Sequence, residues 1–338
     1  MKYSAAKWAT EVAHRAGVTR VLGDMPNAGG CVIMMHSIVS EADPLPLENN
    51  HVSERFLDSL LAYYTKAKVP IVSLDDGLKL TGQDVRTPWV AFSFDDGYRD
   101  NIQLGVPIFR KYGAPMTIFV TSAALDRTMD SYWWGQLRQV VLSKDEIVGE
   151  EVGGRLPAAT AREKVLAYKS IIKSIKVGAL AVEQAEALFQ RNGVSRTAAL
   201  DRDCMTAAEL GELDLEAHRV TIGGHSTGHV PLTQLSGEEV AADVAANRER
   251  LSILTGEEIR YFAYPFGDAA SCGDREFAII EDLGFSAAFT TRGGNIDRAS
   301  EAGRWSLPRR KAIGPVETIG FLECQRSGLA DLAKRARR

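Results

Sequence analysis

The sequence predicts an α/β protein: a distorted (β/α) barrel of parallel strands that carries one helical insertion. Short apolar runs alternate with amphipathic segments in both halves of the chain, which is typical of parallel βα units. This alternation is interrupted at about residues 124–204, where the apolar spacing is helical only. Polar motifs directly follow three of the apolar runs, and a barrel gathers such residues at the carboxyl ends of its strands. About seven strands with interleaved helices favour a closed barrel over an open sheet.

The elements before the insertion follow from the spacing of apolar residues and from capping. Residues 4–22 are predicted to form an amphipathic helix because Ala5, Trp8 and Val12 are spaced as on one helix face. Ser53 is predicted to cap a helix because its side-chain oxygen can accept a hydrogen bond from a free N–H of the first turn. The other predicted elements are strands at 31–39, 69–74, 89–94 and 116–121 and a helix at 101–112.

The elements from residue 124 onward begin with helical spacing and return to the βα pattern. We interpret the helices predicted within 124–204, near 133–141, 162–175 and 179–191, as an insertion and not as an independent catalytic domain. Thr206 with Glu209 and Ser236 with Glu239 form two capping boxes, each of which opens a helix. The later predicted elements are strands at 220–223, 259–264, 287–290 and 305–309 and a helix at 277–283.

This pattern predicts three regions along the chain. Residues 1–29 are expected to form a helical extension, residues 30–312 the barrel with its insertion, and residues 313–338 a helical tail. The basic letters K-R-A-R-R near the end are interpreted as a solvated helix terminus, where cations suit the helix dipole.

Composition excludes several classes of protein. Of 338 residues, 45% are apolar and 25% are charged, and the formal net charge is -4 from 40 basic and 44 acidic residues. A nucleic-acid-binding protein would carry a basic excess, so no nucleic-acid partner is expected. The four cysteines are widely spaced without a C-x-x-C pair, which favours reduced thiols in a cytosolic protein. We see no signal peptide and no apolar run of about 18 residues, so the sequence predicts a cytoplasmic protein without a transmembrane segment.

Two motifs far apart in the sequence carry the candidate chemistry. Asp95 and Asp96 lie in F-S-F-D-D-G-Y, and His225 and His229 lie in G-G-H-S-T-G-H. One Asp with two His is a ligand set for a divalent metal with open coordination positions, and the second Asp is then available as a base. Zinc is the metal that we expect, while cobalt, nickel, manganese or iron also suit these ligands. The D-D-G letters at 75–77 are interpreted as an ordinary turn.

Three segments resemble the first three motifs of the polysaccharide deacetylases, carbohydrate esterase family 4. They are S-F-D-D-G-Y-R-D-N, G-G-H-S-T-G-H-V-P-L and F-A-Y-P-F-G, and the resemblance covers about residues 30–125 and 205–310. It implies a distorted (β/α) barrel that removes N- or O-acetyl groups from chitin-like sugars, peptidoglycan, xylan or exopolysaccharide.

The resemblance also implies roles for individual residues. Asp95 would be the general base. Asp96, His225 and His229 would be the metal ligands. The backbone N–H of Phe266 occupies the motif position that helps to bind the oxyanion.

The chain departs from the family pattern at two places. The third motif usually has an Arg where this chain has Ala263, and we expect Arg309 to orient Asp95 instead. No histidine follows His229 to supply the late general acid, so His36 is the candidate acid, with a buried core histidine as the alternative. M-H-S-I-V followed by V-S-E-R-F resembles the poly-N-acetylglucosamine deacetylases, in which a circular permutation places this histidine on an N-terminal strand. A closed barrel keeps the geometry because its first and last strands are neighbours.

Four further residues have two interpretations each. Met34 and Trp305 are candidates for lining a pocket for the acetate methyl group, and core packing is the alternative. Trp133 and Trp134 either stack on sugar rings or anchor the insertion.

These observations predict a metal-dependent hydrolase that removes N-acetyl groups from an amino-sugar glycan or its precursor. The alternatives are another C–N amidohydrolase on the same barrel, such as an allantoinase-like enzyme, an O-acetyl esterase, or a non-catalytic glycan-binding protein. The intact set of two Asp and two His residues favours an enzyme.

Overall fold

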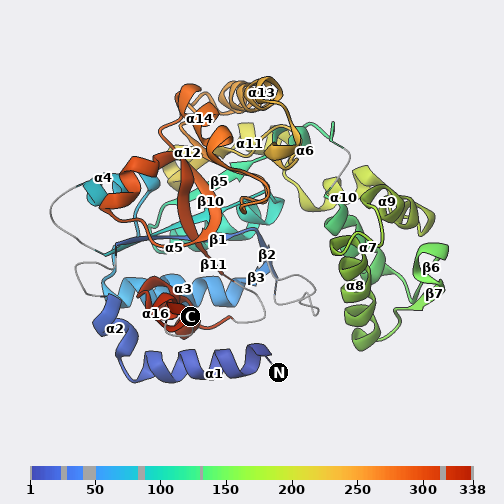
Figure 1. The fold of residues 1–338 in the computed structure, drawn as a ribbon, viewed down its shortest axis with the longest axis horizontal. Coiled ribbons are helices and arrows are strands. Elements are labelled where there is room, and N and C mark those ends of the chain that lie inside the picture. The colour runs from blue at the N-terminus through green and yellow to red at the C-terminus, as the bar shows by residue number, and fades with distance from the viewer. Residues whose placement is uncertain are drawn as a thin grey trace.

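Seven parallel strands close into a barrel (Figure 1). The computed structural model describes residues 2–23, 29–40, 51–82, 88–129, 132–312 and 317–335. The order around the barrel is β1-β11-β10-β9-β8-β5-β4. The bounds are β1 (Gly30–Met35), β4 (Trp89–Phe94), β5 (Met116–Val120), β8 (Val220–Gly224), β9 (Tyr261–Ala263), β10 (Ala287–Gly293) and β11 (Leu307–Lys311). The predicted α/β barrel is therefore confirmed.

The first strand of the chain closes the barrel. In β1, Ile33 lies opposite Arg310 of β11 on one side and Phe92 of β4 on the other. His36 follows β1 directly and so lies between β11, which carries Arg309, and β4, which leads into Asp95. Sequence-distant residues are thus brought to one edge by barrel closure alone.

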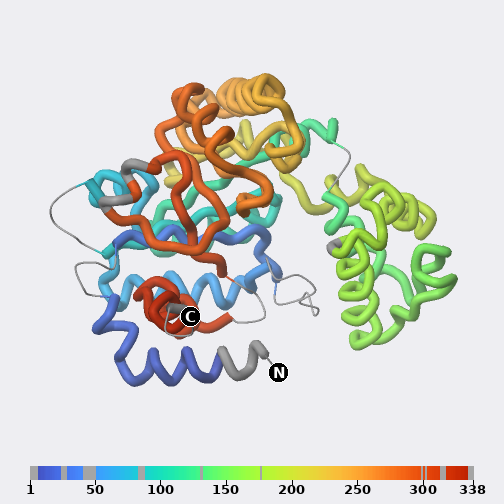
Figure 2. Tube along the Cα trace, viewed as in Figure 1, coloured from blue at the N-terminus to red at the C-terminus, as the bar shows by residue number. Residues whose placement is uncertain are grey.

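Helices surround the barrel, and the helices of the two chain ends lie side by side (Figure 2). Around the barrel they are α3 (Glu54–Ala67), α4 (Leu74–Gly82), α5 (Val106–Lys111), α6 (Ser122–Leu125), α11 (Ala207–Gly211), α12 (Leu215–His218), α13 (Gly237–Thr255) and α14 (Asp274–Asp282). The terminal helices are α1 (Lys2–Arg15), α2 (Val18–Gly23), α15 (Ile319–Arg326) and α16 (Leu329–Arg335). None of the helices within the described residues is long and apolar enough to cross a membrane.

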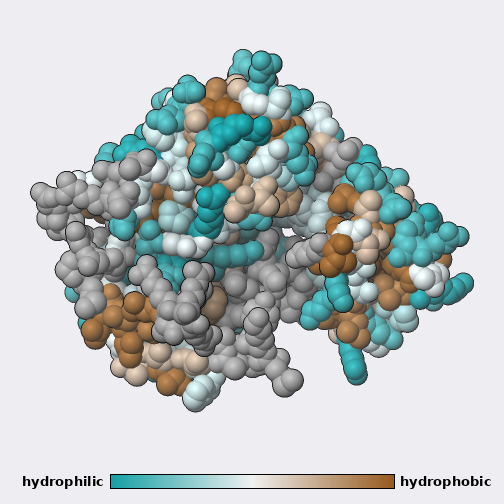
Figure 3. Space-filling model, viewed as in Figure 1, coloured by the Kyte–Doolittle hydropathy of each residue, from teal (hydrophilic) through white to brown (hydrophobic). Residues whose placement is uncertain are grey.

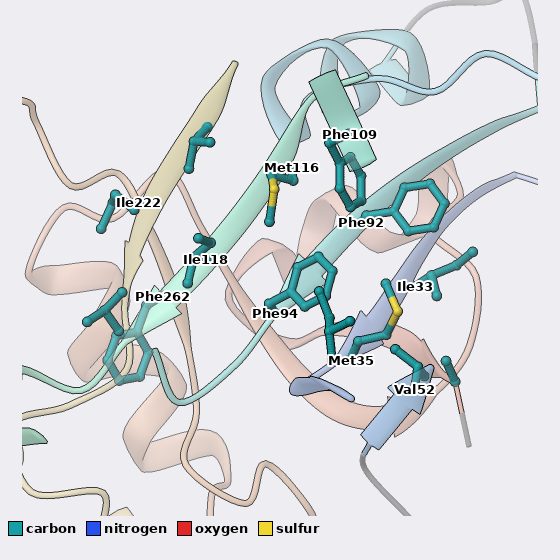
Figure 4. Packing of buried hydrophobic residues seen from close by; sticks show 14 of the residues in the cluster. Ile33, Met35, Val52, Phe92, Phe94, Phe109, Met116, Ile118, Ile222 and Phe262 are labelled. Atoms are coloured by element: carbon teal, nitrogen blue, oxygen red, sulfur yellow. The ribbon is translucent and has the colours of Figure 1, made fainter. Parts of the chain in front are cut away.

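Alternation along the strands separates an outer core from an inner one. In β4, Phe92 and Phe94 pack outward with Phe109 of α5 (Figure 4). Trp89 and Ala91, one position out of phase, pack in the cluster inside the barrel. Successive side chains of a strand point to opposite faces, so the same phase directs Ser93 and Asp95 inward. This is why an apolar strand can end in a carboxylate aimed at the barrel axis.

The predicted insertion has a core of its own beside the barrel (Figure 1). Its helices are α7 (Trp133–Ser143), α8 (Ala161–Lys176), α9 (Val182–Arg191) and α10 (Arg196–Asp203), and the first three match predicted helices. A short antiparallel hairpin, β6 (Glu146–Gly149) with β7 (Gly154–Pro157), was not predicted. Gly153 in its turn and Gly154 at the start of β7 both have positive φ, which an L side chain rarely adopts.

The structure corrects one strand and one turn. The strand predicted at 69–74 is reduced to a single bridge between Ile71 and Val90, and α4 begins at Leu74. Ser73 explains the change, because its hydroxyl accepts a hydrogen bond from the backbone N–H of Asp76 at 3.1 Å and so caps the helix. The D-D-G at 75–77 is therefore the first part of a helix and not a turn.

Two other predicted elements are each divided in two. The N-terminal helix breaks at Gly17, whose φ of 79° lies in the left-handed region. The run at 31–39 divides at His36 into β1 and the short strand β2 (Ser37–Val39), which pairs with β3 (His51–Ser53). The break lets His36 leave the barrel wall at the same edge as the other motif residues.

Candidate functional site

Three buried side chains converge at the carboxyl edge of the barrel. Asp96 follows β4, and His225 and His229 follow β8. The Oδ1 atom of Asp96 lies 3.2 Å from Nε2 of His225 and 3.1 Å from Nε2 of His229. All three ligand atoms lie within 4.8 Å of one another, so one ion could contact them together. The structure thus assembles a candidate site for a divalent metal from the residues that the sequence predicted.

The hydrogen bonds of His225 show that these residues fit a cation. Its Nδ1 atom lies 2.7 Å from the carbonyl oxygen of Ala263, which can only accept, so Nδ1 carries the proton. The neutral ring then points the lone pair of Nε2 at the Asp96 carboxylate, whose buried Oδ1 has no hydrogen-bond partner among the described residues. Two facing acceptors require a proton or a cation between them. A carbonyl that fixes the histidine tautomer is also typical of metal ligands.

Charge at the site favours ionised carboxylates. Burial alone would raise the pKa of Asp96, but the close imidazoles of His229 and His225 hold it well below the usual range. Burial tends to lower the pKa of His225, but Asp96 and Asp95 outweigh this effect and raise it. The carboxylate is therefore deprotonated, as a metal ligand must be.

Asp95, the other carboxylate of the D-D-G motif, is held by Arg309. The guanidinium donates two parallel hydrogen bonds, each 2.7 Å long, to the two carboxylate oxygens. The same guanidinium donates to the hydroxyl of Ser93 at 3.1 Å and to the backbone oxygen of Thr290 at 3.0 Å. Burial raises the pKa of Asp95, but the charge of Arg309 and its hydrogen bonds more than offset this and lower it. The contact that the family pattern places on the residue at Ala263 is made here from β11.

Strained backbone is concentrated at this edge. Seven non-glycine residues of the described chain have positive φ, and four of them are Asp96 (75°), Ser226 (62°), His229 (54°) and Phe266 (60°). Such conformations cost about 1–3 kcal/mol each and persist where the surroundings impose them, often at functional sites. Their concentration here is independent support for a functional site.

The turn that presents His225 depends on two glycines and on Asn247. A Cβ at Gly223 would lie 2.4 Å from the ring of Phe119, and one at Gly224 would lie 2.7 Å from the side chain of Asn247. The fully buried Asn247 amide accepts from the N–H of His225 at 3.2 Å and donates to the backbone oxygen of Ser226 at 2.7 Å. The sequence prediction missed Asn247 because an isolated Asn on α13 has no local motif.

His36 and Phe266 complete the edge. Burial lowers the pKa of His36 to about 4, against the opposing charges of Asp96 and Asp95. Its Nδ1 atom is buried and forms no hydrogen bond with the described residues. Phe266 follows β9, and its ring packs edge-on against His229 with centroids 4.9 Å apart. Its backbone N–H donates to none of the described residues, so it is available to a ligand.

Met34 and Trp305 occupy different environments. Met34 is buried on β1, in the inward phase shared with Val32 and next to Ser93 of β4. Trp305 packs against the outer core, and its indole N–H donates to the backbone oxygen of Phe285 at 2.8 Å. The structure therefore brings Met34, but not Trp305, toward the residues around Asp95.

The insertion reaches the metal site through two aromatic residues. The hydroxyl of Tyr132 donates to the backbone oxygen of Asp96 at 2.9 Å, and its ring stacks on Trp134 with centroids 4.9 Å apart. Both rings lie edge-on to His229, with centroids 5.3 Å and 5.5 Å away. Trp133 contacts Trp134 and packs against the core of the insertion, farther from the site. Tyr132 was not predicted, because a side chain that contacts a backbone oxygen belongs to no recognisable sequence motif.

Replacing Tyr132 with phenylalanine is expected to weaken metal binding about tenfold while the protein stays folded. The change removes one hydroxyl that restrains Asp96 in its left-handed conformation, and outer partners of metal ligands typically contribute about 10–100-fold in affinity. Calorimetric titration of metal-free protein with zinc measures the effect. His225→Ala is expected to lose the site altogether, and Tyr168→Phe, in the core of the insertion, is the control. Unchanged zinc affinity in Tyr132→Phe would contradict this role.

Comparison with known proteins identifies the family to which this barrel and its motifs belong. The family model described as polysaccharide deacetylase matches residues 82–148 and 181–288. The gap between these segments lies inside the insertion. Among curated proteins, none matches the chain.

Several solved structures share the fold at low sequence identity. IcaB from Ammonifex degensii has a TM-score of 0.55 at 17% identity, covering 88% of this chain and 97% of that one. The Streptococcus pyogenes deacetylase PplD in complex with acetate scores 0.54 at 15% identity, covering 85% and 95%. A de-N-acetylase from Aggregatibacter actinomycetemcomitans scores 0.53 at 14% identity, covering 88% and 99%. With its motifs on a matching barrel and the family model spanning more than half of its length, the chain belongs to the polysaccharide deacetylase family.

Proposed function

We propose that this protein is a metal-dependent hydrolase that removes N-acetyl groups from an amino-sugar glycan or its precursor. The observation that carries the proposal is the pairing of two sites at one edge of the barrel. The Asp96–His225–His229 cluster fits a divalent cation, and Asp95, the residue that precedes Asp96, is a separate buried carboxylate held by Arg309. A metal hydrolase needs such a carboxylate beside the cation, free of coordination, to act as a base.

Each residue at this edge then has a chemical task. A bound divalent ion, zinc by default, would polarise the acetyl carbonyl and acidify a bound water toward a pKa of about 7. Asp95, oriented by Arg309, takes a proton from the attacking water. The N–H of Phe266 donates to the oxyanion that develops on the carbonyl oxygen. His36 gives a proton to the nitrogen of the leaving amine after it has taken one up, which burial opposes and the carboxylates of Asp96 and Asp95 favour.

The place of His36 supports a permuted arrangement of the family site. β1 lies between β4, which leads into Asp95, and β11, which carries Arg309. A histidine at the end of β1 therefore reaches the same edge as one at the end of a last strand would. We infer a substrate class like that of poly-N-acetylglucosamine deacetylases, in which the scissile bond is an amide.

The test is acetate release from a panel of substrates by metal-stripped and zinc-loaded protein. Loaded protein is expected to release acetate from N-acetylglucosamine oligomers, and stripped protein is expected to release almost none. Cobalt, nickel and manganese in place of zinc identify the preferred ion. Turnover of small ureides alone would point to an allantoinase-like enzyme, and turnover of acetylated xylan alone to an esterase. Stoichiometric metal binding without turnover of any of these would indicate a non-catalytic protein.

A further inference from the structure

The helices α1 and α2 present an apolar surface to solvent. Ten large apolar side chains are exposed in the described part of the chain, and four of them lie within its first 23 residues. Trp8 is 71% exposed, Val21 68%, Val12 46% and Val18 40%. In the space-filling view, apolar side chains gather at the lower left, over α2 and the adjoining part of α1 (Figure 3). We call these four residues the terminal-helix surface.

Contacts with α15 fix α1 to the rest of the protein. Glu11 accepts a hydrogen bond from the backbone N–H of Gly320 at 2.9 Å, and a Cβ at Gly320 would lie 2.9 Å from the Cα of Glu11. The thiol of Cys324 also approaches the backbone oxygen of Thr10. Because α1 is already packed against α15, the exposure of Trp8 and Val12 is not explained by an undocked helix.

Cations outnumber acids around the terminal-helix surface. Lys7, Arg15 and Arg20 are all exposed, and the one acid among residues 2–23, Glu11, accepts a hydrogen bond from the backbone of Gly320 and pairs with Arg15 at 3.6 Å. The terminal-helix surface therefore combines an aromatic residue and three valines with a positive rim. That combination is typical of helices that lie in the interface of an anionic lipid bilayer.

Other partners suit these residues less well. A second copy of the chain would place Lys7, Arg15 and Arg20 against like charges. One tryptophan and three valines also offer less area than the about 800 Å² per partner of a stable interface. A nucleic acid would attract the cations but would gain nothing from the valines.

We propose that the terminal-helix surface docks the protein on an anionic phospholipid surface, with Trp8 and Val21 entering the headgroup region and Lys7, Arg15 and Arg20 contacting lipid phosphates. Docking of this kind does not depend on the hydrolase activity. It would bring the barrel to the membrane surface.

Sedimentation of the full chain with vesicles tests the proposal. Wild-type protein is expected to sediment with vesicles of phosphatidylglycerol and phosphatidylcholine, to release as salt is raised, and to ignore phosphatidylcholine alone. Each cation near an anionic surface contributes about fivefold. Replacing both Arg15 and Arg20 with Glu is therefore expected to lower binding by more than about tenfold. A separate variant, in which Ser replaces both Trp8 and Val21, is also expected to bind more than about tenfold more weakly.

Matched changes elsewhere control for general effects on exposed residues. Val177→Ser with Ile253→Ser alters two side chains that are 66% and 68% exposed, and Arg162→Glu with Lys173→Glu alters two exposed cations of α8. Both controls are expected to bind as wild type. The proposal is overturned if wild type ignores anionic vesicles, or if the variants at the terminal-helix surface still bind them. It is also overturned if sedimentation velocity shows that the apolar pair abolishes a dimer instead.

Discussion

Replacing Arg309 with alanine is expected to lower acetate release by at least about 100-fold and to destabilise the protein by about 3–5 kcal/mol. Arg309 is only 1% exposed and donates both hydrogen bonds that orient the Asp95 carboxylate. Removing one partner of a buried ion pair leaves the other charge buried and uncompensated, which is the main source of the lost stability. The same loss frees Asp95 to rotate away from the position in which it meets the attacking water.

The neighbouring Arg310 provides a control that separates the loss of activity from the loss of stability. Arg310 is equally buried on β11 but points away from the barrel axis, where it pairs with Asp331. Arg310→Ala is expected to destabilise the protein while the activity of the folded fraction stays near wild type. Chemical denaturation and acetate release are measured on both variants. If Arg310→Ala reduced turnover as much as Arg309→Ala, a specific role of Arg309 in positioning Asp95 would be excluded.

A double-mutant cycle shows whether Arg309 acts through Asp95. Asp95→Asn alone is expected to remove most of the activity, because an amide cannot take up the proton from water. Adding Arg309→Ala to Asp95→Asn is expected to cost little further activity, since the group that Arg309 orients is already gone. Losses that multiplied in the double variant would mean that Arg309 contacts the substrate itself.

The metal cluster could be predicted from sequence because its signal is local. Asp95 with Asp96, and His225 with His229, lie in short motifs whose letters carry both the chemistry and the turn geometry. An apolar run before each motif indicates the strand that positions it. Asn247 and Tyr132 could not be found in this way. They act on backbone groups of Asp96 and of the His225 turn, so only the folded chain shows their partners.

The pairing of Arg309 with Asp95 could be predicted only in part from the sequence. The two residues are 214 positions apart, and they meet only because β1, β4 and β11 are neighbours in the closed barrel. The absence of the family arginine at Ala263 indicated that a substitute was needed, and the barrel order shows which strand supplies it. In contrast, the strand predicted at 69–74 was wrong because Pro70 has no N–H to pair and Ser73 caps a helix. Local capping there overrode the apolar pattern.

Replacing His36 with alanine is expected to slow hydrolysis of an N-acetyl amide by about 10²–10⁴-fold. An amine is a poor leaving group until it is protonated. Removing a positioned acid therefore slows the step that breaks the C–N bond. An aryl acetate ester releases a phenolate, which needs no proton, and its hydrolysis is expected to fall less than about tenfold. The prediction is therefore a change in the ratio of the two rates.

The rate ratio distinguishes an acid from a residue that only supports the fold. Structural damage would slow both substrates together, whereas loss of the acid slows the amide selectively. His218→Ala, on α12 away from the barrel edge, is the matched control and should leave both rates unchanged. Equal losses on the amide and the ester in His36→Ala would make His36 a packing residue. The proton for the amine would then have to come from Asp95 after it has taken one from water, and the permuted-acid arrangement would be wrong.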